Sequence, residues 1–549
     1  MSVNQDHAST TSRSLSLRLP KALPWLIAFI AMLPTLALYL AHYLGTPAGQ
    51  IRTGFVSYDQ PYYMADARAY FADGFHWLYG LPFSPFADTP HIYFQPQTLF
   101  LGVIWHVTQI DPGALFVAFG IIAGLIAFRL AIALFHRVAG EGGDARTIVL
   151  AMFLGGGGFA VMLWMLHHAP GEDLFAFEPS AGWWMPNLGR VAVYSLEAYY
   201  HAVFFGTVLL LMARRYGFAL IFTALLSASH PFSGLELALT VCAWGGLEFL
   251  ISRRTAPPFW FLCGAGAVLM AHFAYYMVAL GHFSPEHAAL QEEWTLPWVR
   301  YKSQIIATLG MVGLMAAARL AWPSRFMAAI KDRQFRLLGS WFLVAMALAQ
   351  HDWFVTPRQP VHFTHAYDWV PLFLIGAPMM VRVVDYLLSR RTLVARLAIA
   401  AMLVVAFLDN SIWFARIIER SWAGEAASEE AHDMRMPVTM RDALTELNAP
   451  AYADDLIVSD SETLPYYATA YTPLRAWYSH SFNTPYPAQR KAEQAALLQQ
   501  GADLPAWQGR KMVAAVAVTD TTALAHLDAL GYRTTYRNKD FVILTRAPS

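Results

Sequence analysis

Charged side chains are scarce in this chain of 549 residues. Asp, Glu, Lys and Arg make up 14% of it, against about 25% in an average soluble domain. Hydrophobic residues make up 56%, yet the mean hydropathy is only +0.37, so a strongly apolar part is averaged with a polar part. The formal net charge is zero, and no basic excess points to nucleic acid as a partner. The composition predicts a membrane protein with an attached soluble domain.

Cysteine is rare and internal repeats are absent. Cys242 and Cys263 both lie in apolar runs, which argues against a disulfide framework or a cysteine metal site. The two halves of the chain show no repeat of the kind that many secondary transporters have. The apolar run 22–44 is too long for the core of a signal peptide and has no convincing cleavage site. We therefore expect a retained first helix there.

Apolar runs predict about eleven spanning helices, since one crossing needs roughly 20 apolar residues. The runs are 22–44, 113–136, 146–166, 196–213, 217–229, 235–252, 259–280, 302–321, 335–350, 363–381 and 393–410. The run 217–229 is too short to cross alone and ends at His230. With 235–252 it is interpreted as a broken hairpin that turns inside the protein.

The basic residues that connect these runs fall into two unequal sets, which predicts the orientation. One set holds eighteen: Arg13, Arg18, Lys21, Arg137, Arg146, Arg214, Arg215, Arg253, Arg254, Arg319, Arg325, Lys331, Arg333, Arg336, Arg382, Arg390, Arg391 and Arg396. The other holds five: Arg52, Arg68, Arg190, Arg300 and Arg358. We expect a bacterial inner-membrane protein whose N-terminal tail, residues 1–21, is cytoplasmic and whose C-terminal part is periplasmic.

The segment 95–110 is apolar enough to resemble a further helix. As a full span it would invert every later loop and carry the arginine clusters outside. We interpret it as a short helix that enters the outer leaflet without crossing, and a true span with an error elsewhere in the count is the alternative. It belongs to a long outer loop, 45–112, rich in Tyr, Phe, Trp and Pro. In this loop, residues 65–72 are expected to form an amphipathic helix along the membrane surface.

The composition changes after Asn410. The membrane domain is expected at 22–410, and residues 411–440 are charged and are interpreted as a helical or extended linker. From 441 to 549, short apolar strands alternate with helical patterns, as in LIVSD (456–460) followed by AQRKAEQAALLQQ (488–500). This alternation predicts a small α/β domain with a largely parallel sheet.

Asp59 is the main candidate for chemistry. It follows the first helix by about 15 residues and lies beside Tyr62 and Tyr63, which are expected to line the same site. A carboxylate just above the membrane is suited to act as general base for an acceptor hydroxyl. The alternative is a surface carboxylate that caps the following helix, and Asp66 is the main competitor for the catalytic role.

Three further outer segments carry candidate groups. The loop after 166 offers His168, Glu172 and Asp173 to a divalent metal, although no tight ligand motif is present and a solvated acidic loop is the alternative. His230 lies at the break of the predicted hairpin, where freed backbone groups tend to line cavities.

The segment around 351–368 holds His351 and His365 as candidate substrate contacts. Its Arg358 is suited to bind a phosphate bidentately or, alternatively, to anchor the chain at the lipid headgroups.

The layout resembles the GT-C superfamily of integral-membrane glycosyltransferases. The resemblance rests on the cytoplasmic N-terminus, the many helices, the outer C-terminal domain and the early Tyr58-Asp59-Gln60 motif, where many members have Asp-Glu. The segment TPLRAWYSHSFNTP (472–485), centred on His480 and Thr484-Pro485, is similar to a recurrent segment of bacterial members.

The resemblance implies transfer of a sugar from a polyprenyl-phosphate carrier to an outer-face glycan, lipid or protein, with inversion and with Asp59 as base. Some relatives use a divalent metal. Asp59 and Arg358 should then face one cavity with their charged ends on the order of 6–12 Å apart, so that a sugar ring fits between them. A transporter and an inactive scaffold with this fold are the competing functions.

Overall fold

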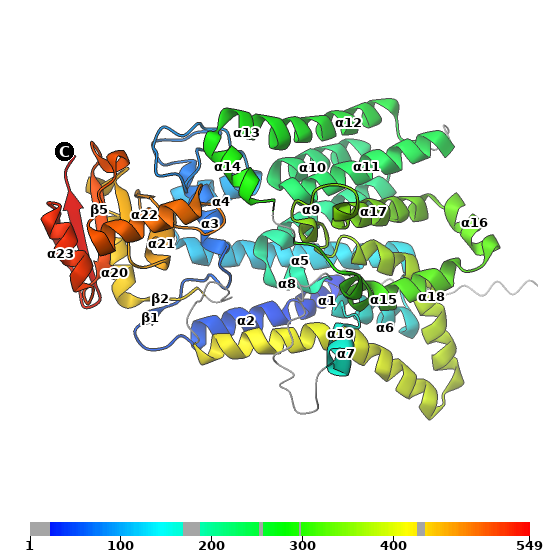
Figure 1. Ribbon diagram of the computed structural model, residues 1–549. Coiled ribbons are helices and arrows are strands. Elements are labelled where there is room, and N and C mark those ends of the chain that lie inside the picture. Colours follow the sequence, from blue (N-terminus) through cyan, green and yellow to red (C-terminus); the bar gives the residue numbers. More distant parts are fainter. Residues whose placement is uncertain (1–21, 168–186, 252–255, 296–297, 425–433, 549) are drawn as a thin grey trace, which may run out of the picture.

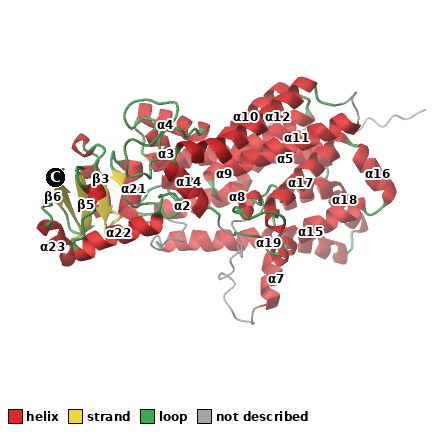
Figure 2. Cartoon of the chain, turned by 45° about the horizontal axis from the view of Figure 1, so that its top comes forward, coloured by secondary structure: helices red, strands yellow, loops and turns green. Residues whose placement is uncertain are grey.

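Long helices make up most of the computed structural model, and a small sheet lies at one end of it (Figures 1 and 2). The structure describes residues 22–167, 187–251, 256–295, 298–424 and 434–548. The sheet belongs to the C-terminal domain, which follows the helical part in the chain. The molecule is elongated along the direction of its helices (Figure 1).

Seven helical segments of the described residues are long and apolar enough to cross a membrane. They are α5 (Pro112–Ala139), α9 (Ser195–Met212), α11 (Pro231–Ile251), α12 (Phe259–Phe273) continued through a π-helical turn (Ala274–Ala279) into α13 (Leu280–Phe283), α15 (Lys302–Leu320), α18 (Trp369–Arg390) and α19 (Leu393–Ala423). An eighth span is possible by length if α1 (Leu23–Ala31) and α2 (Leu33–Leu44), bent by 48°, count as one.

The predicted number of eleven spans is not confirmed, because three of the predicted runs form short helices. These are α10 (Tyr216–Ser229), α17 (Arg333–Ala349) and the run 146–166, which is split into α6 (Asp144–Gly155) and α7 (Ala160–His167). Four consecutive glycines, 155–158, interrupt that run, and Gly156 has a φ of +70° that favours glycine. The Asp409 carboxylate then accepts from the backbone N–H groups of Gly158 and Val161 at the start of α7, at 2.9 and 3.0 Å.

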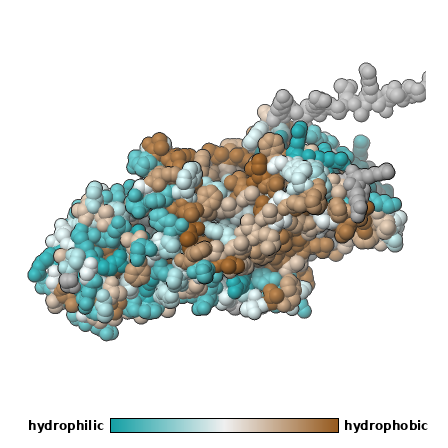
Figure 3. Space-filling view, turned by 90° about the horizontal axis from the view of Figure 1, so that it is seen from above, coloured by the Kyte–Doolittle hydropathy of each residue, from teal (hydrophilic) through white to brown (hydrophobic). Residues whose placement is uncertain are grey.

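Apolar side chains cover the helical part, and hydrophilic side chains gather at its two ends (Figure 3). At the end opposite the C-terminal domain lie α16 (Pro323–Lys331) and the junction of α18 with α19 (Figure 1). Both places carry residues of the larger basic set found in the sequence, such as Arg325 in α16 and Arg391 at the junction. The apolar surface of the middle part (Figure 3) and the long apolar helices indicate a membrane protein.

The loop 45–112, which the sequence predicts on the outer side and which we call the first outer loop, packs against the rest of the protein. Its helix α3 (Gln60–Ala69) buries Met64, Ala65 and Ala67, so the predicted surface-lying amphipathic helix is wrong. Two facts explain the burial: α3 packs against α21 of the C-terminal domain on one side and against α4 (Pro96–Thr108) on another. The helix α4 is the short helix expected at 95–110, with 13 residues. Its position in the outer leaflet stays a prediction.

The C-terminal domain has a five-stranded sheet in the order β4-β3-β5-β7-β6. The strands are β3 (Leu456–Ser459), β4 (Arg475–Ala476), β5 (Met512–Ala517), β6 (Arg533–Arg537) and β7 (Phe541–Arg546), and the helices are α20 (Val438–Leu447), α21 (Thr463–Tyr471), α22 (Pro487–Gln500) and α23 (Thr521–Ala529). The expectation of a largely parallel sheet is wrong for half of it. Strand β3 pairs in parallel with β4 and β5, whereas β7 is antiparallel to both neighbours. The reason is the short turn 538–540, which makes β6 and β7 a hairpin.

Two connections fasten the C-terminal domain to the membrane part. Helix α19 continues to Ala423, so the first part of the expected linker is helical. Farther on, β2 (Met436–Pro437) pairs antiparallel with β1 (Gln50–Ile51) of the first outer loop. Beside it, the buried Arg435 donates to the backbone carbonyls of His42 and Ser421. The domain is thus joined to the ends of α2 and α19.

Candidate functional site

Asp59 lies at the first turn of α3, where the outer loop meets the C-terminal domain. It is the N-cap residue, yet its carboxylate makes no capping hydrogen bond. The side chain is 59% exposed, and its Oδ1 lies 3.5 Å from Nε2 of the fully buried His480. The carboxylate therefore keeps free lone pairs at an open surface, as a general base requires.

His480 is held by its own loop. The backbone N–H of Phe482 donates to its Nδ1 at 3.1 Å, and the Thr484 N–H donates to its carbonyl at 2.9 Å. An N–H group can only donate, so Nδ1 accepts in this contact. Nε2 is the nitrogen that lies toward Asp59. The loop around Thr484 thus sets the direction of the imidazole.

Aromatic residues fix the backbone on both sides of Asp59. The Tyr466 hydroxyl of α21 donates to the Tyr58 carbonyl at 2.5 Å and accepts from the Tyr62 N–H at 2.9 Å. The Tyr58 hydroxyl in turn accepts from the Ser481 N–H at 3.1 Å. We call Asp59, His480 and these tyrosines the Asp59–His480 site. It is built by two parts of the chain that are far apart in sequence.

Behind the site, α3 turns two further candidates into the interior. Burial raises the pKa of the Asp66 carboxyl well above its usual value, while hydrogen bonds from Tyr79 and Tyr62 oppose the rise. Burial also raises the pKa of Tyr63, and the carboxylates of Asp59 and Glu197 add to it. Asp66 is thus a buried acid that lacks the exposure of Asp59.

Glu197, at the start of α9, is the centre of a buried ionic cluster. It contacts Nη2 of Arg190 at 3.1 Å and Nδ1 of His365 at 2.7 Å. His201, one turn later, has Nε2 at 2.7 Å from the His365 carbonyl. Burial lowers the pKa of His365 to about 4, the charge of Arg190 lowers it further, and Glu197 opposes both.

Contacts connect this cluster with the Asp59–His480 site. Phe482, two residues after His480, packs edge-on against Trp298, and the rings of Trp298 and His362 lie 5.9 Å apart. His362 in turn lies 5.3 Å from His365. A chain of aromatic and imidazole ring contacts therefore connects the loop of His480 with the cluster that contains His365.

The remaining candidates make local contacts in other parts of the fold. Arg358 is exposed, and within the described residues its guanidinium forms no ion pair with Asp59. Its backbone N–H donates to Nε2 of His351 at 2.9 Å, so His351 shapes this loop. His230 stacks on Tyr200 at 4.4 Å. The distance between Arg358 and Asp59 that the sequence predicts stays a prediction.

The metal candidates His168, Glu172 and Asp173 lie outside the described residues. Among the residues that the structure does describe, no group of three or more His, Cys, Asp or Glu side chains could hold a metal ion.

The residue pattern alone does not identify two partners of the candidate residues, His480 and Arg190. Only the resemblance singled out His480, because no spacing rule links it to Asp59. Arg190 was counted only as a basic residue of the outer side. Arg190 comes shortly before a helix that has Glu197 in its first turn, and this arrangement is the sequence signal for an ion pair between them.

No family model matches the chain, and no curated protein matches it in sequence. Solved structures are similar in fold. The oligosaccharyltransferase of Archaeoglobus fulgidus, tethered to an acceptor peptide, aligns over 93% of this chain and 68% of that chain, with 12% identity and a TM-score of 0.50. The arabinofuranosyltransferase AftD from Mycobacteria aligns over 97% and 40%, with 13% identity and a TM-score of 0.52. ArnT from Cupriavidus metallidurans aligns over 96% and 98%, with 13% identity and a TM-score of 0.46.

Proposed function

Because the chain has the fold of the GT-C membrane glycosyltransferases, we propose that it transfers a sugar from a polyprenyl-phosphate carrier to an acceptor at the outer face of a bacterial inner membrane. The observation that carries this proposal is the exposed Asp59 carboxylate, which makes no capping hydrogen bond and lies 3.5 Å from Nε2 of His480. A carboxylate with free lone pairs beside an open surface can remove a proton from an incoming hydroxyl.

The proposed reaction is a single displacement. Asp59 takes the proton of the acceptor hydroxyl, and the hydroxyl oxygen forms a bond to the anomeric carbon. The bond from that carbon to the phosphate oxygen breaks, and polyprenyl phosphate leaves with the electron pair. Attack opposite the leaving group inverts the configuration. Arg358, exposed in the loop after His351, is the proposed partner of the leaving phosphate.

Residues near Asp59 are proposed to position the substrates. Tyr62 and Tyr63 adjoin the base, and the donor lipid is expected to enter sideways from the membrane. His365 is proposed to border the path between lipid and base, and the ring contacts from Phe482 to His365 support this. His230 and His351 are proposed as further substrate contacts.

The Asp59→Asn variant tests the proposal. Purified protein in liposomes is incubated with a panel of polyprenyl-phosphate sugars, and release of free polyprenyl phosphate is measured. We expect turnover to fall by about 10²–10⁴-fold, the usual contribution of a general base, with an unchanged melting temperature. Asp88→Asn, an exposed carboxylate of the same loop, is the matched control. Full turnover by Asp59→Asn would sink the catalytic assignment, and an inactive wild type would favour the scaffold.

A further inference from the structure

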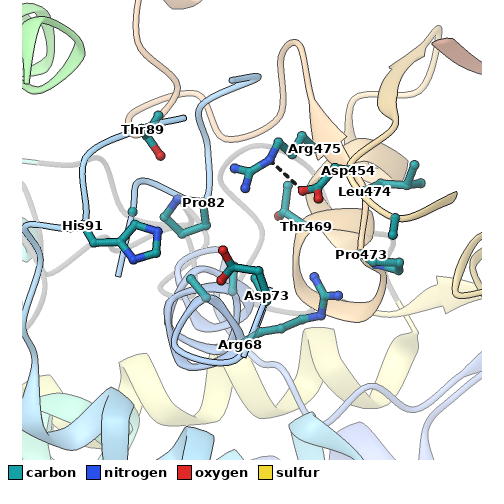
Figure 4. Close-up of a pocket in the computed structure, with 15 residues that line it drawn as sticks. Arg68, Asp73, Pro82, Thr89, His91, Asp454, Thr469, Pro473, Leu474 and Arg475 are labelled. Atoms are coloured by element: carbon teal, nitrogen blue, oxygen red, sulfur yellow. Dashed lines mark hydrogen bonds and ion pairs between the residues drawn. The ribbon is translucent and has the colours of Figure 1, made fainter. Parts of the chain in front are cut away.

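A hollow lies between the C-terminal end of α3 and the C-terminal domain (Figure 4). Its cavity volume is about 60 Å³, it is open to solvent, and neither Asp59 nor His480 lines it. Its polar walls come from the outer loop, with Arg68, Asp73 and His91, and from the C-terminal domain, with Asp454 and Arg475. The two parts of the chain that form the Asp59–His480 site therefore also form this hollow.

Two arginines enter the hollow from different walls (Figure 4). Arg475 of β4 is paired, since its Nε lies 3.1 Å from Oδ1 of Asp454. Asp73 is paired with His76 at 3.1 Å. Within the described part of the chain, the Arg68 guanidinium forms neither a hydrogen bond nor an ion pair. Arg68 is thus the cation of the hollow that lacks a partner.

The surroundings of Arg68 favour an anion. Burial lowers its pKa to about 10, the charge of Arg475 lowers it further, and Asp454 opposes both. It stays protonated at neutral pH. Like charges in a half-buried hollow repel, and an anion between them relieves that repulsion. Thr89, which also lines the hollow, has a buried Oγ1 without a hydrogen-bond partner and is free to donate to such an anion.

We propose that this hollow, the Arg68–Arg475 pocket, binds an anionic group, a phosphate or a carboxylate, carried by the sugar acceptor. The planar guanidinium of arginine matches both groups through paired N–H donors. The assignment to the acceptor rests on the proposed function, whereas the binding of an anion does not. An acceptor held here is bound by the same two chain parts that flank Asp59.

The binding test uses the full chain in detergent. Inorganic phosphate and glucuronate are titrated separately at constant ionic strength, and affinity is obtained from the rise in melting temperature, since a ligand bound only by the folded state stabilises it. We expect Arg68→Gln to weaken binding tenfold or more. Arg533→Gln removes an exposed arginine of the C-terminal domain, which is paired with Asp528 outside the pocket, and should leave the affinity unchanged. The stronger probe identifies the anion class.

Several outcomes overturn the pocket: binding of neither probe to the wild type, equal affinities for wild type and Arg68→Gln, or an equal loss in Arg533→Gln. A lower melting temperature of unliganded Arg68→Gln would assign Arg68 to the fold instead. The Asp59→Asn variant separates the two proposals. It should bind the probes as the wild type does, so a failure of catalysis leaves anion binding standing, and a failure of anion binding leaves catalysis standing.

Discussion

The His480 imidazole has one nitrogen bound by a backbone N–H and the other directed at Asp59. It acts through Asp59 and is a positioning residue. Its Nε2 lies 3.5 Å from Oδ1 of Asp59, and we expect loss of this polar contact to lower the rate roughly tenfold, which corresponds to about 1.4 kcal/mol. We predict such a fall in kcat for His480→Ala, a smaller fall for His480→Gln, which keeps an N–H donor, and an unchanged KM for the donor lipid.

The control for His480 is Ser481→Ala, which touches Tyr58 and not the carboxylate. Equal losses in His480→Ala and Ser481→Ala would assign the effect to the loop.

Asp66 gives a prediction about stability and pH. Its pKa is raised by burial in the folded state, so the folded chain binds a proton that the unfolded chain releases. The free energy of unfolding therefore falls as the pH rises from the usual carboxyl value of about 3.9 toward the raised one. Asp66→Asn stays neutral. We predict that the melting temperature of Asp66→Asn changes less between pH 5 and 9 than that of the wild type, by on the order of 2 °C or more.

The wild-type slope should persist in Asp88→Asn. An Asp66→Asn variant with the wild-type slope would show that Asp66 is ionised in the folded protein.

The sequence singles out Asp59 because a carboxylate among tyrosines is chemically conspicuous, and its catalytic role stays a prediction. The relation of Asp59 to Asp66 could not be predicted from the sequence. Seven positions separate the two, which is near two helical turns, yet one is 59% exposed in its side chain and the other is buried. The difference arises because α3 is covered by α4 and α21, and contacts between distant segments carry no local signal.

Among the elements, α4 allows a direct test. Asp88 before it and Ile110 after it are exposed, and if the helix does not cross the membrane both ends face outward. We predict that Asp88→Cys and Ile110→Cys are both labelled by an impermeant thiol reagent in intact cells. The background is a chain with Cys242 and Cys263 replaced by alanine, because Cys263 is exposed. Protection of position 110 alone would show that α4 spans.

Helices of full length were well predicted, and so was the break at His230 between α10 and α11, whereas the break at the four glycines was not. Hydropathy located α5 and α19, which have 28 and 31 residues, more than the roughly 20 that one crossing needs. It also joined α6 to α7, since glycine scores as mildly apolar although it frees the backbone to turn. The strand pattern gave the α/β class of the C-terminal domain. It could not give strand direction, which depends on how each connection returns.

For the whole molecule, the basic residues predict one orientation. The α16 region lies at the end opposite the C-terminal domain (Figure 1). The positive-inside rule then assigns the α16 end to the cytoplasm and the C-terminal domain to the periplasm. We predict that a tag after Ser549 is accessible from outside and a tag before Met1 is not. A C-terminal reporter active in the cytoplasm would overturn the topology, and with it the proposed outer-face chemistry.

The pairing of β1 with β2 has a consequence for biosynthesis. Gln50 and Ile51 leave the ribosome early, and their partners Met436 and Pro437 follow after all of the spanning helices. His480 emerges later still. During synthesis Asp59 is therefore made before its imidazole partner and before Tyr466, which fixes its backbone. The Asp59–His480 site can be completed only after the C-terminal domain has been made and has folded against the loop that carries Asp59.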